Sequence, residues 1–380
     1  MSKIINLFNR IAQPLKLKSS NSANLPKSNV DIKRRASYAI RPQPKRYVSY
    51  EINDIKAALI SSSNPEQPDR TKLFGIYHYI LQDGHLTSQL HSAMQKILAE
   101  PYGFYINENV DKDSSSITHT VWFEQLLTYI IEVEFYGFRM IELSVNGSEI
   151  EIELIPNENV CPEKKVIWLQ SAFQKPFIEY DDIEDELGLL FFGNKKDLGI
   201  LYKAAYNVLW KFYARSDWSR ASEKFGMPIL AIEANTNNDD ELDRLELRAA
   251  AFGTDGFIVT QEGDKVNIIE RGTDNGHIIY LENIRYCDEQ ISKLINGQTG
   301  TSDEKSFTGS AEVHERLMND ITYARMRRIT YAINNTLMPF LLKKGLISNS
   351  SLEFSFDKIK NPDKYKKVTT PNPPTNVPNN

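Results

Sequence analysis

The chain has 380 residues, of which 41% are hydrophobic and 25% charged, a composition typical of a folded protein that buries a core. Its formal net charge of -5 argues against a protein that coats nucleic acid over its whole surface. Cys161 and Cys287 are too few for a disulfide framework or a metal cluster, and no apolar run approaches the ~18 residues that span a bilayer.

The first 66 residues are rich in Ser, Asn, Pro and Lys and show little periodicity beyond a short helical pattern at 3–11. Residues 1–50 carry eleven Lys or Arg side chains against a single acid, Asp31. This composition predicts a basic, mostly disordered arm over 1–66, which we expect to bind an acidic partner. The basic start has no continuous apolar region and no small-residue cleavage site, so we do not expect a signal peptide.

The next part of the chain is predicted, in order, as helix 73–80, helix 86–97, helix 119–136, hairpin 139–155 and strand 166–169. Gly137 follows the third helix as a C-cap would. Asn146-Gly147 suits a type I′ turn in the hairpin, and the alternation of Ile or Leu with Glu predicts that one of its faces meets solvent. Six acids within 179–186 predict a solvated loop rather than a metal site.

The remaining elements are predicted as helix 198–223, strand 227–234, helix 241–251, strands 257–260 and 266–270, and helix 311–342. Trp210 and Trp218 lie on the first of these helices, whose aromatic content exceeds what one small domain needs for its core. Pro339 lacks an N–H group and is expected to bend or end the last helix. Pro, Asn, Lys and Thr dominate from residue 361, which predicts a largely disordered end of the chain.

The most informative segment runs from Asp288 to Leu317. A helical run breaks at Asn296-Gly297, a polar stretch extends from Gln298 to Ser310, and an amphipathic pattern restarts at Ala311. Loops of this length inside a compact domain are uncommon, and they are usually functional or disordered.

Catalytic and cofactor motifs are not found in the sequence. It has no phosphate-binding glycine loop, no G-x-S-x-G elbow, no H-E-x-x-H and no Cys/His metal spacing, and its six histidines are scattered. We therefore expect no enzyme activity, no cofactor, no metal and no catalytic residue.

Several collinear motifs resemble the Mu-like phage portal family. They are Leu81-Gln-Asp-Gly-His-Leu, Tyr136-Gly-Phe, Glu223-Lys-Phe-Gly-Met-Pro, Asn296-Gly-Gln-Thr and Ala311-Glu-Val-His. Together they span about residues 70–345, and the Phe-Gly-x-Pro and Gly-Gln-Thr elements are the most specific of them.

The resemblance implies an α+β, portal-like fold: an elongated subunit of a ring, with a mixed α/β wing, a helical stem, a small β clip and a long C-terminal helix. The implied boundaries are an arm at 1–66, wing at 67–193 and 254–345, stem helix 194–226, clip 227–240, second stem helix 241–253, tunnel loop 296–312 and tail 346–380.

By the same resemblance, the protein is expected to form a homododecameric ring at one capsid vertex of the virion, a structural head–tail connector for viral genome packaging and DNA ejection. Its implied partners are the terminase large subunit, a head–tail adaptor, a major capsid or scaffold protein and double-stranded DNA, with assembly in the host cytoplasm. A nucleic-acid-processing enzyme without a recognisable motif and a DNA-binding scaffold are the alternatives that the sequence leaves open.

Two sets of residues are expected to carry this function. The tunnel loop would contact DNA non-specifically through phosphates, using Gln298, Thr299, Thr301, Ser302, Lys305 and Ser306. The clip would dock partners through Asn235, Asn237, Asn238, Asp239, Asp240 and Glu241, although acids there also suit a solvated helix N-terminus.

Overall fold

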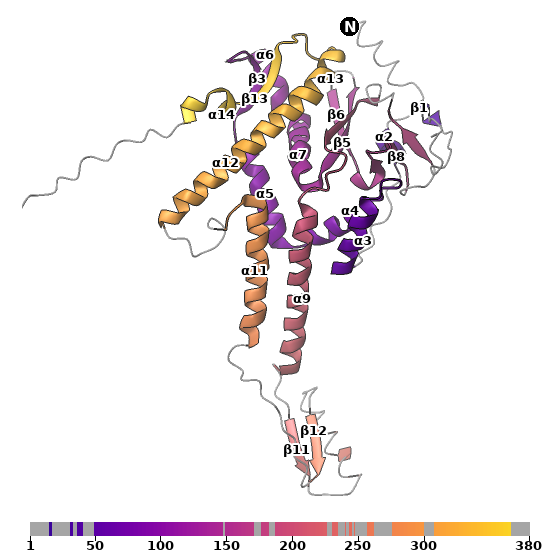
Figure 1. Cartoon of the computed structure of the whole chain (residues 1–380), viewed down its shortest axis with the longest axis vertical. Coiled ribbons are helices and arrows are strands. Elements are labelled where there is room, and N and C mark those ends of the chain that lie inside the picture. Colours follow the sequence, from indigo (N-terminus) through magenta and orange to yellow (C-terminus); the bar gives the residue numbers. More distant parts are fainter. Residues whose placement is uncertain are drawn as a thin grey trace, which may run out of the picture. The chain divides into compact units, whose positions relative to one another are not determined.

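The computed structural model describes residues 15–16, 31–32, 36–40, 49–146, 149–170, 176–181, 187–225, 230–234, 240, 243–244, 247, 257–261, 276–299 and 308–365. The chain forms two compact units, the larger from residues 1–205 and 292–380 and the smaller from residues 206–291. Helices and small sheets occur together, so the fold is α+β, as the sequence predicts (Figure 1). The predicted short helix at 3–11 lies outside the described residues.

The larger unit begins with short elements of the N-terminal region. These are the antiparallel pair β1 (Leu15–Lys16) and β2 (Asp31–Ile32), α2 (Ala36–Ala39) and α3 (Ile52–Ser62). The α3 helix lies inside the range predicted as a mostly disordered arm, and the Asp54 carboxylate at its start accepts a hydrogen bond from the Glu51 N–H at 2.8 Å. This helix was not predicted, because residues 1–66 as a whole are rich in Ser, Asn, Pro and Lys and the run Ser61–Ser63 directly follows its apolar positions.

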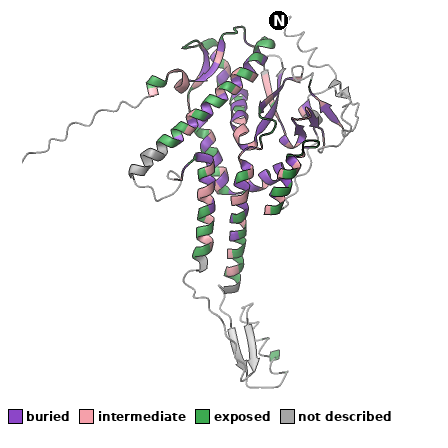
Figure 2. Ribbon diagram, in the orientation of Figure 1, coloured by how far each residue is buried: buried purple, intermediate pink, exposed green. Residues whose placement is uncertain are grey.

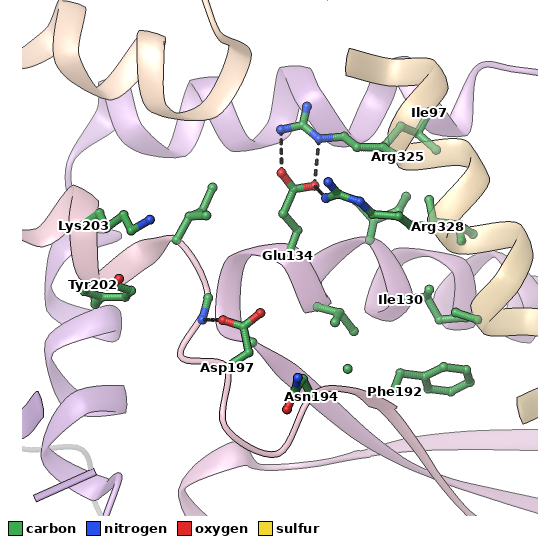
Figure 3. A pocket seen from close by; sticks show the side chains of 18 residues that line it. Ile97, Ile130, Glu134, Phe192, Asn194, Asp197, Tyr202, Lys203, Arg325 and Arg328 are labelled. Atoms are coloured by element: carbon green, nitrogen blue, oxygen red, sulfur yellow. Dashed lines mark hydrogen bonds and ion pairs between the residues drawn. The ribbon is translucent and has the colours of Figure 1, made fainter. Parts of the chain in front are cut away.

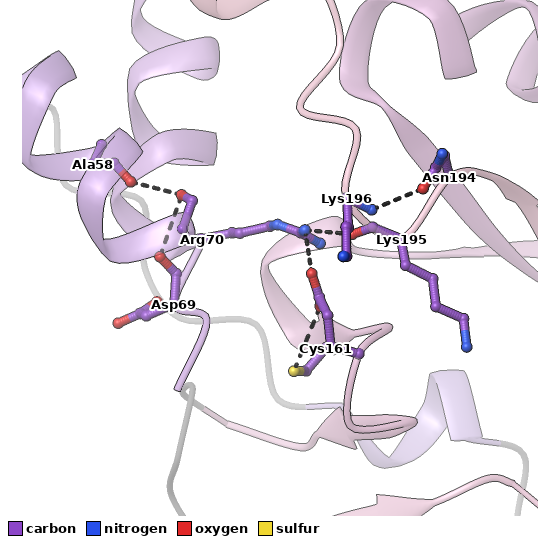
Figure 4. A network of polar contacts seen from close by, with 9 residues as sticks. Ala58, Asp69, Arg70, Cys161, Asn194, Lys195 and Lys196 are labelled. Carbon is purple, nitrogen blue, oxygen red and sulfur yellow. Dashed lines mark hydrogen bonds and ion pairs between the residues drawn. The ribbon is translucent and has the colours of Figure 1, made fainter. Parts of the chain in front are cut away.

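Helices α4 (Thr71–Ile80) and α5 (Gly84–Leu98) confirm the paired helical pattern. Asp83 separates them because its carboxylate accepts from the Leu86 N–H at 2.9 Å, which caps the start of α5. Arg70, the residue before α4, is buried and donates to the Glu163 carboxylate at 2.6 Å and to the Lys195 carbonyl at 2.5 Å (Figure 4). This arginine therefore ties the start of α4 to two loops that are distant in sequence.

The central sheet has the strand order β10 (Leu189–Gly193), β5 (Phe138–Asn146), β6 (Glu149–Ile155), and all pairs are antiparallel. It packs against α7 (Val121–Tyr136), which ends at Gly137 with φ 88°. Asn146, predicted as a turn residue, is the last residue of β5 and pairs with Glu149, and Gly147 lies outside the described residues.

The expectation of a solvent-exposed face on this hairpin is wrong for β5. Met140, Ile141, Leu143 and the charged Glu142 are all buried (Figure 2). The short α2 segment explains the burial of Glu142, whose carboxylate accepts from the Ala36 and Ser37 N–H groups at 2.9 and 3.0 Å. Two backbone donors compensate the buried charge.

Two more antiparallel sheets complete the larger unit. One has the order β13 (Leu352–Phe356), β3 (Tyr102–Ile106), β4 (Asn109–Val110), and α6 (Lys112–Ser115) and a 3₁₀ turn (Ser116–His119) follow β4. The other has the order β7 (Val160–Cys161), β8 (Val166–Trp168), β9 (Phe177–Glu179), after a 3₁₀ turn (Asn157–Asn159). Cys161 packs here with Val166, Trp168 and Phe177, and burial raises the pKa of its thiol to about 11.

The strand β13 corrects the prediction for the tail at 346–380. It pairs with β3, and α14 (Asp357–Lys360) and a 3₁₀ turn (Pro362–Tyr365) follow it. The Asp357 carboxylate accepts hydrogen bonds from Asn361, Lys364 and Tyr365 at 2.7 to 2.8 Å. Order therefore extends at least to residue 365.

The long C-terminal helix has three parts: α12 (Thr308–Ala332), a π-helical turn (Ile333–Leu337) and α13 (Met338–Lys343). Pro339, expected to bend or end the helix, lies at the start of α13 directly after the π-helical turn, and the helix does not end there but continues to Lys343. The π turn contains Asn334, whose side-chain amide hydrogen-bonds the Phe354 N–H and carbonyl of β13 at 2.8 and 2.9 Å. Within the larger unit, α12 packs against α5 and α7 (Figure 1).

The smaller unit contains most of α9 (Leu201–Phe225) and α11 (Gly276–Asn296), together with β11 (Leu230–Ala234) and β12 (Phe257–Gln261). The two strands pair in parallel. Lys211 of α9 and Asp288 of α11 form an ion pair at 2.5 Å. The sequence analysis located only the last part of α11, near Ile291–Ile295; the predicted strand 266–270 lies outside the described residues.

Candidate functional site

The N-terminal base of the expected tunnel loop lies where α11 ends. Gly297 follows the helix with φ 70°, and its N–H donates to the Lys293 carbonyl at 3.0 Å. A side chain at this position would adopt a strained conformation, and its Cβ would lie 2.6 Å from the Ile321 side chain on α12. The break predicted at Asn296-Gly297 is therefore the C-terminal end of α11.

Two side-chain contacts hold the last turns of α11 against α5. The Asn296 side-chain amide donates to the Gln89 side-chain oxygen at 2.6 Å, and both residues are buried. One turn earlier, Ser292 is fully buried and its hydroxyl lies 2.8 Å from His85 Nε2. Buried amides and hydroxyls that are paired in this way select one arrangement of the two helices.

A third contact comes from α12, the helix that follows the loop. Arg325 is buried at 6% exposure, and its guanidinium makes two hydrogen bonds to the Glu134 carboxylate of α7, at 2.9 and 3.1 Å (Figure 3). The same guanidinium donates to the carbonyl of Ile295, in the last turn of α11, at 2.6 Å. Arg325 thus connects three helices at the base of the loop.

The Glu134–Arg325 pair also lies on the wall of a cavity of about 640 Å³ in the larger unit (Figure 3). Apolar side chains that include Ile130 and Phe192 line one part of it, and Asp197, Lys203 and Arg328 contribute charges. Arg328 approaches Glu134 at 3.9 Å but is 73% exposed, so this second ion pair is weaker than the first.

The described residues hold no cluster of three or more His, Cys, Asp or Glu side chains that suits a metal ion. Across the same ranges, no helix is long and apolar enough to cross a membrane.

The residues predicted to touch DNA divide into two groups. Gln298 is buried at 4% exposure and belongs to the packed base of the loop, whereas Thr299, the next residue, is half-buried. The other four lie outside the described residues: Thr301, Ser302, Lys305 and Ser306.

Of the residues predicted for partner docking, the structure describes Asp240, which is exposed. The others lie outside the described residues: Asn235, Asn237, Asn238, Asp239 and Glu241. The acidic run also lies largely outside them, at 182–186.

The sequence analysis missed Gln89, Glu134 and Arg325. A signal for Arg325 was present, because buried residues of α12 and the π-helical turn recur with helical spacing at Met318, Thr322, Arg325, Ile329 and Ile333. An arginine on an apolar stripe needs a buried acceptor, and that requirement marks it as a residue of interest. Nothing in the sequence identifies the acceptors that it uses.

Comparison with known proteins identifies the class. The family described as the portal protein of Mu bacteriophage matches residues 74–371 of the 380. The chain therefore belongs to the Mu-like phage portal family, which confirms the resemblance of its motifs. Among solved structures it is similar to an HK97-family phage portal protein from Corynebacterium diphtheriae, at 17% identity and a TM-score of 0.43, over 76% of this chain and 97% of that one. No curated protein matches the chain.

Proposed function

We propose that this protein forms the ring at one vertex of a phage capsid, through which double-stranded DNA is packaged and later ejected. The observation that carries the proposal is the match of residues 74–371 to a portal family. The mild net charge of -5 agrees with this proposal, because a channel that passes DNA of any sequence must not bind phosphates tightly.

The contacts between neighbouring subunits are proposed to involve α9 and α11. Trp210 and Tyr213, at three-residue spacing on α9, are 46% and 40% exposed, and Ile279 and Tyr286, at seven-residue spacing on α11, are 72% and 55% exposed. Large apolar side chains grouped on helix surfaces favour an interface. Repeated head-to-tail contacts between copies close into a ring when the rotation allows.

We assign α9 and α11 as the two stem helices, because the Lys211–Asp288 ion pair joins them within the smaller unit. The sequence assigned the second stem helix to 241–253, of which the structure describes residues 243, 244 and 247 as helical. The clip is proposed to include β12 as well as β11. The reason is that β11 pairs in parallel with β12 of the same chain.

The loop after Gln298 is proposed to touch DNA without sequence preference, through Lys305 and the Ser and Thr hydroxyl groups. Shortening the loop within 301–306 should leave rings intact and reduce packaged or retained DNA. Unchanged DNA content and retention would show that the loop lacks this function.

The remaining contacts are proposed to occur at the arm and the clip. The eleven basic residues of 1–50 are proposed to bind DNA, a scaffold or a capsid protein. The acidic tip of the clip is proposed to bind the terminase large subunit first and then, in exchange, a head–tail adaptor. Assembly would occur in the host cytoplasm and the final place would be the virion vertex. Charge reversal at Asp239, Asp240 and Glu241 should spare rings and block packaging or tail joining.

Electron microscopy of the purified protein tests the ring directly, and class averages give the subunit number, for which we expect twelve. The double variant Trp210→Glu/Tyr286→Glu should lose rings, because each change places a charge in an apolar contact. Ile60→Glu is the matched control, since Ile60 is 75% exposed on α3, outside the proposed contact. Wild-type protein that stays monomeric across salt and concentration would refute the proposal.

A further inference from the structure

Arg325 differs from the nearby Arg328 in its burial and in its hydrogen bonds. Its side chain is 7% exposed, whereas that of Arg328, one turn along α12, is 73% exposed. Desolvating a guanidinium is costly unless its donors are used. Two of its donors go to the Glu134 carboxylate and one to the Ile295 carbonyl. The Glu134 pair alone would satisfy the charge, so the bond to Ile295 requires its own explanation.

The Ile295 carbonyl belongs to the last turn of α11, where carbonyl groups have no partner within the helix. Such groups are normally satisfied by the following few residues or by water, and a positive charge beside them is also favoured by the helix dipole. Here the donor comes from a residue 30 positions later, on the helix that begins after the loop. Arg325 lies on α12, which follows the loop. It therefore caps the C-terminal end of α11, which precedes the loop.

We infer that Arg325 is the positioning residue of the tunnel loop: it fixes the last turn of α11 to α12 and α7, so that the part proposed to contact DNA begins after Gln298. The burial of Gln298, the Asn296–Gln89 hydrogen bond and the close approach of Gly297 to Ile321 give the same boundary. The inference rests on the proposed function, because the loop that Arg325 positions is the one proposed to contact DNA.

Hydrogen–deuterium exchange on assembled full-length protein tests the cap without any DNA. Arg325→Lys keeps the charge, but an ammonium group lacks the planar fork that reaches Glu134 and Ile295 together. Losing one hydrogen bond to a charged donor should speed amide exchange in residues 294–298 by about tenfold or more. Exchange in α7 should change little. Arg328→Gln is the matched control, because Arg328 approaches the same carboxylate without bonding α11, and it should leave 294–298 unchanged.

A charge swap separates the cap from the ion pair. In Arg325→Glu/Glu134→Arg the pair can re-form, so thermal stability should recover relative to Arg325→Glu alone. The new carboxylate cannot donate to the Ile295 carbonyl, so residues 294–298 should still exchange rapidly. Wild-type exchange of this segment in the swap or in Arg325→Lys would overturn the inference, as would an equal effect of Arg328→Gln.

The DNA content of heads assembled with Arg325→Lys distinguishes this inference from the proposed function. Faster exchange with reduced DNA retention supports both. Faster exchange with normal retention keeps Arg325 as the positioning residue and rejects DNA contact by the loop. Unchanged exchange rejects the positioning residue whatever the heads contain.

Discussion

The Lys211–Asp288 ion pair makes an asymmetric prediction for the proposed stem. The Lys211 side chain is 1% exposed and the Asp288 side chain is 25% exposed, at a distance of 2.5 Å. Replacing Asp288 by Asn removes a carboxylate that pairs with the buried Lys211 ammonium group. Replacing Lys211 by Met keeps the aliphatic contacts of the side chain and leaves a carboxylate that water can partly solvate.

The magnitudes follow from this difference in exposure. Breaking a buried pair so that a charge stays buried without its partner costs about 3–5 kcal/mol. Asp288→Asn should fall in the lower part of this range, near 3 kcal/mol, because the Asn oxygen still accepts a hydrogen bond. Lys211→Met should cost about 1 kcal/mol, since it exchanges a pair with one partly solvated member for apolar packing. The double variant should resemble Lys211→Met.

Hydrogen exchange of peptides from α9 and α11 measures these differences as local opening free energies. Arg285→Gln is a suitable control, because its pair with Glu282 is exposed on both sides and should contribute little. If Lys211→Met is as damaging as Asp288→Asn, or the double variant is worse than both, the buried charge does not dominate and the reasoning is wrong.

Three further predictions concern the larger unit. Gly137→Ala should prevent soluble expression, because residue 137 has a φ of 88° and the added Cβ would lie 2.2 Å from the Asp197 carbonyl oxygen. Gly84→Ala is the control: the added Cβ meets open space at the start of α5, so this variant should be neutral or stabilising in a thermal melt. Glu142→Leu should remove two charge-assisted hydrogen bonds of about 1.5–3 kcal/mol each and speed proteolysis near Ala36, with ring formation unchanged. Hydrogen bonds from Lys364, Tyr365 and Asn361 lower the pKa of Asp357 from 3.8 to about 2. The Asp357 carboxylate therefore stabilises the C-terminal segment above about pH 4, and this stabilisation is lost as the pH falls to 2. Asp357→Asn should reproduce that loss at neutral pH, measured as faster amide exchange in residues 361–365.

The sequence determined the elements that depend on local pattern and local chemistry. Apolar residues at helical spacing located α4, α5 and α7, and Gly137 marked the end of α7 because a positive φ is a property of a single residue. The break at Asn296-Gly297 was visible for the same reason. The motifs that resemble portal proteins also stand in the sequence, and the match of residues 74–371 to the family confirms that resemblance.

Only the tertiary structure decided the parts that join distant segments. Glu142 looked like a solvent-facing strand residue, and it is buried because an N–H group 106 residues earlier reaches it. β13 looked like part of a disordered tail, and it is a strand because β3 offers it an edge. Arg325 contacts a carboxylate 191 residues away and a carbonyl 30 residues away. Periodicity reports which face of an element is apolar, but the partner of a buried polar group is fixed only when the chain brings the two together.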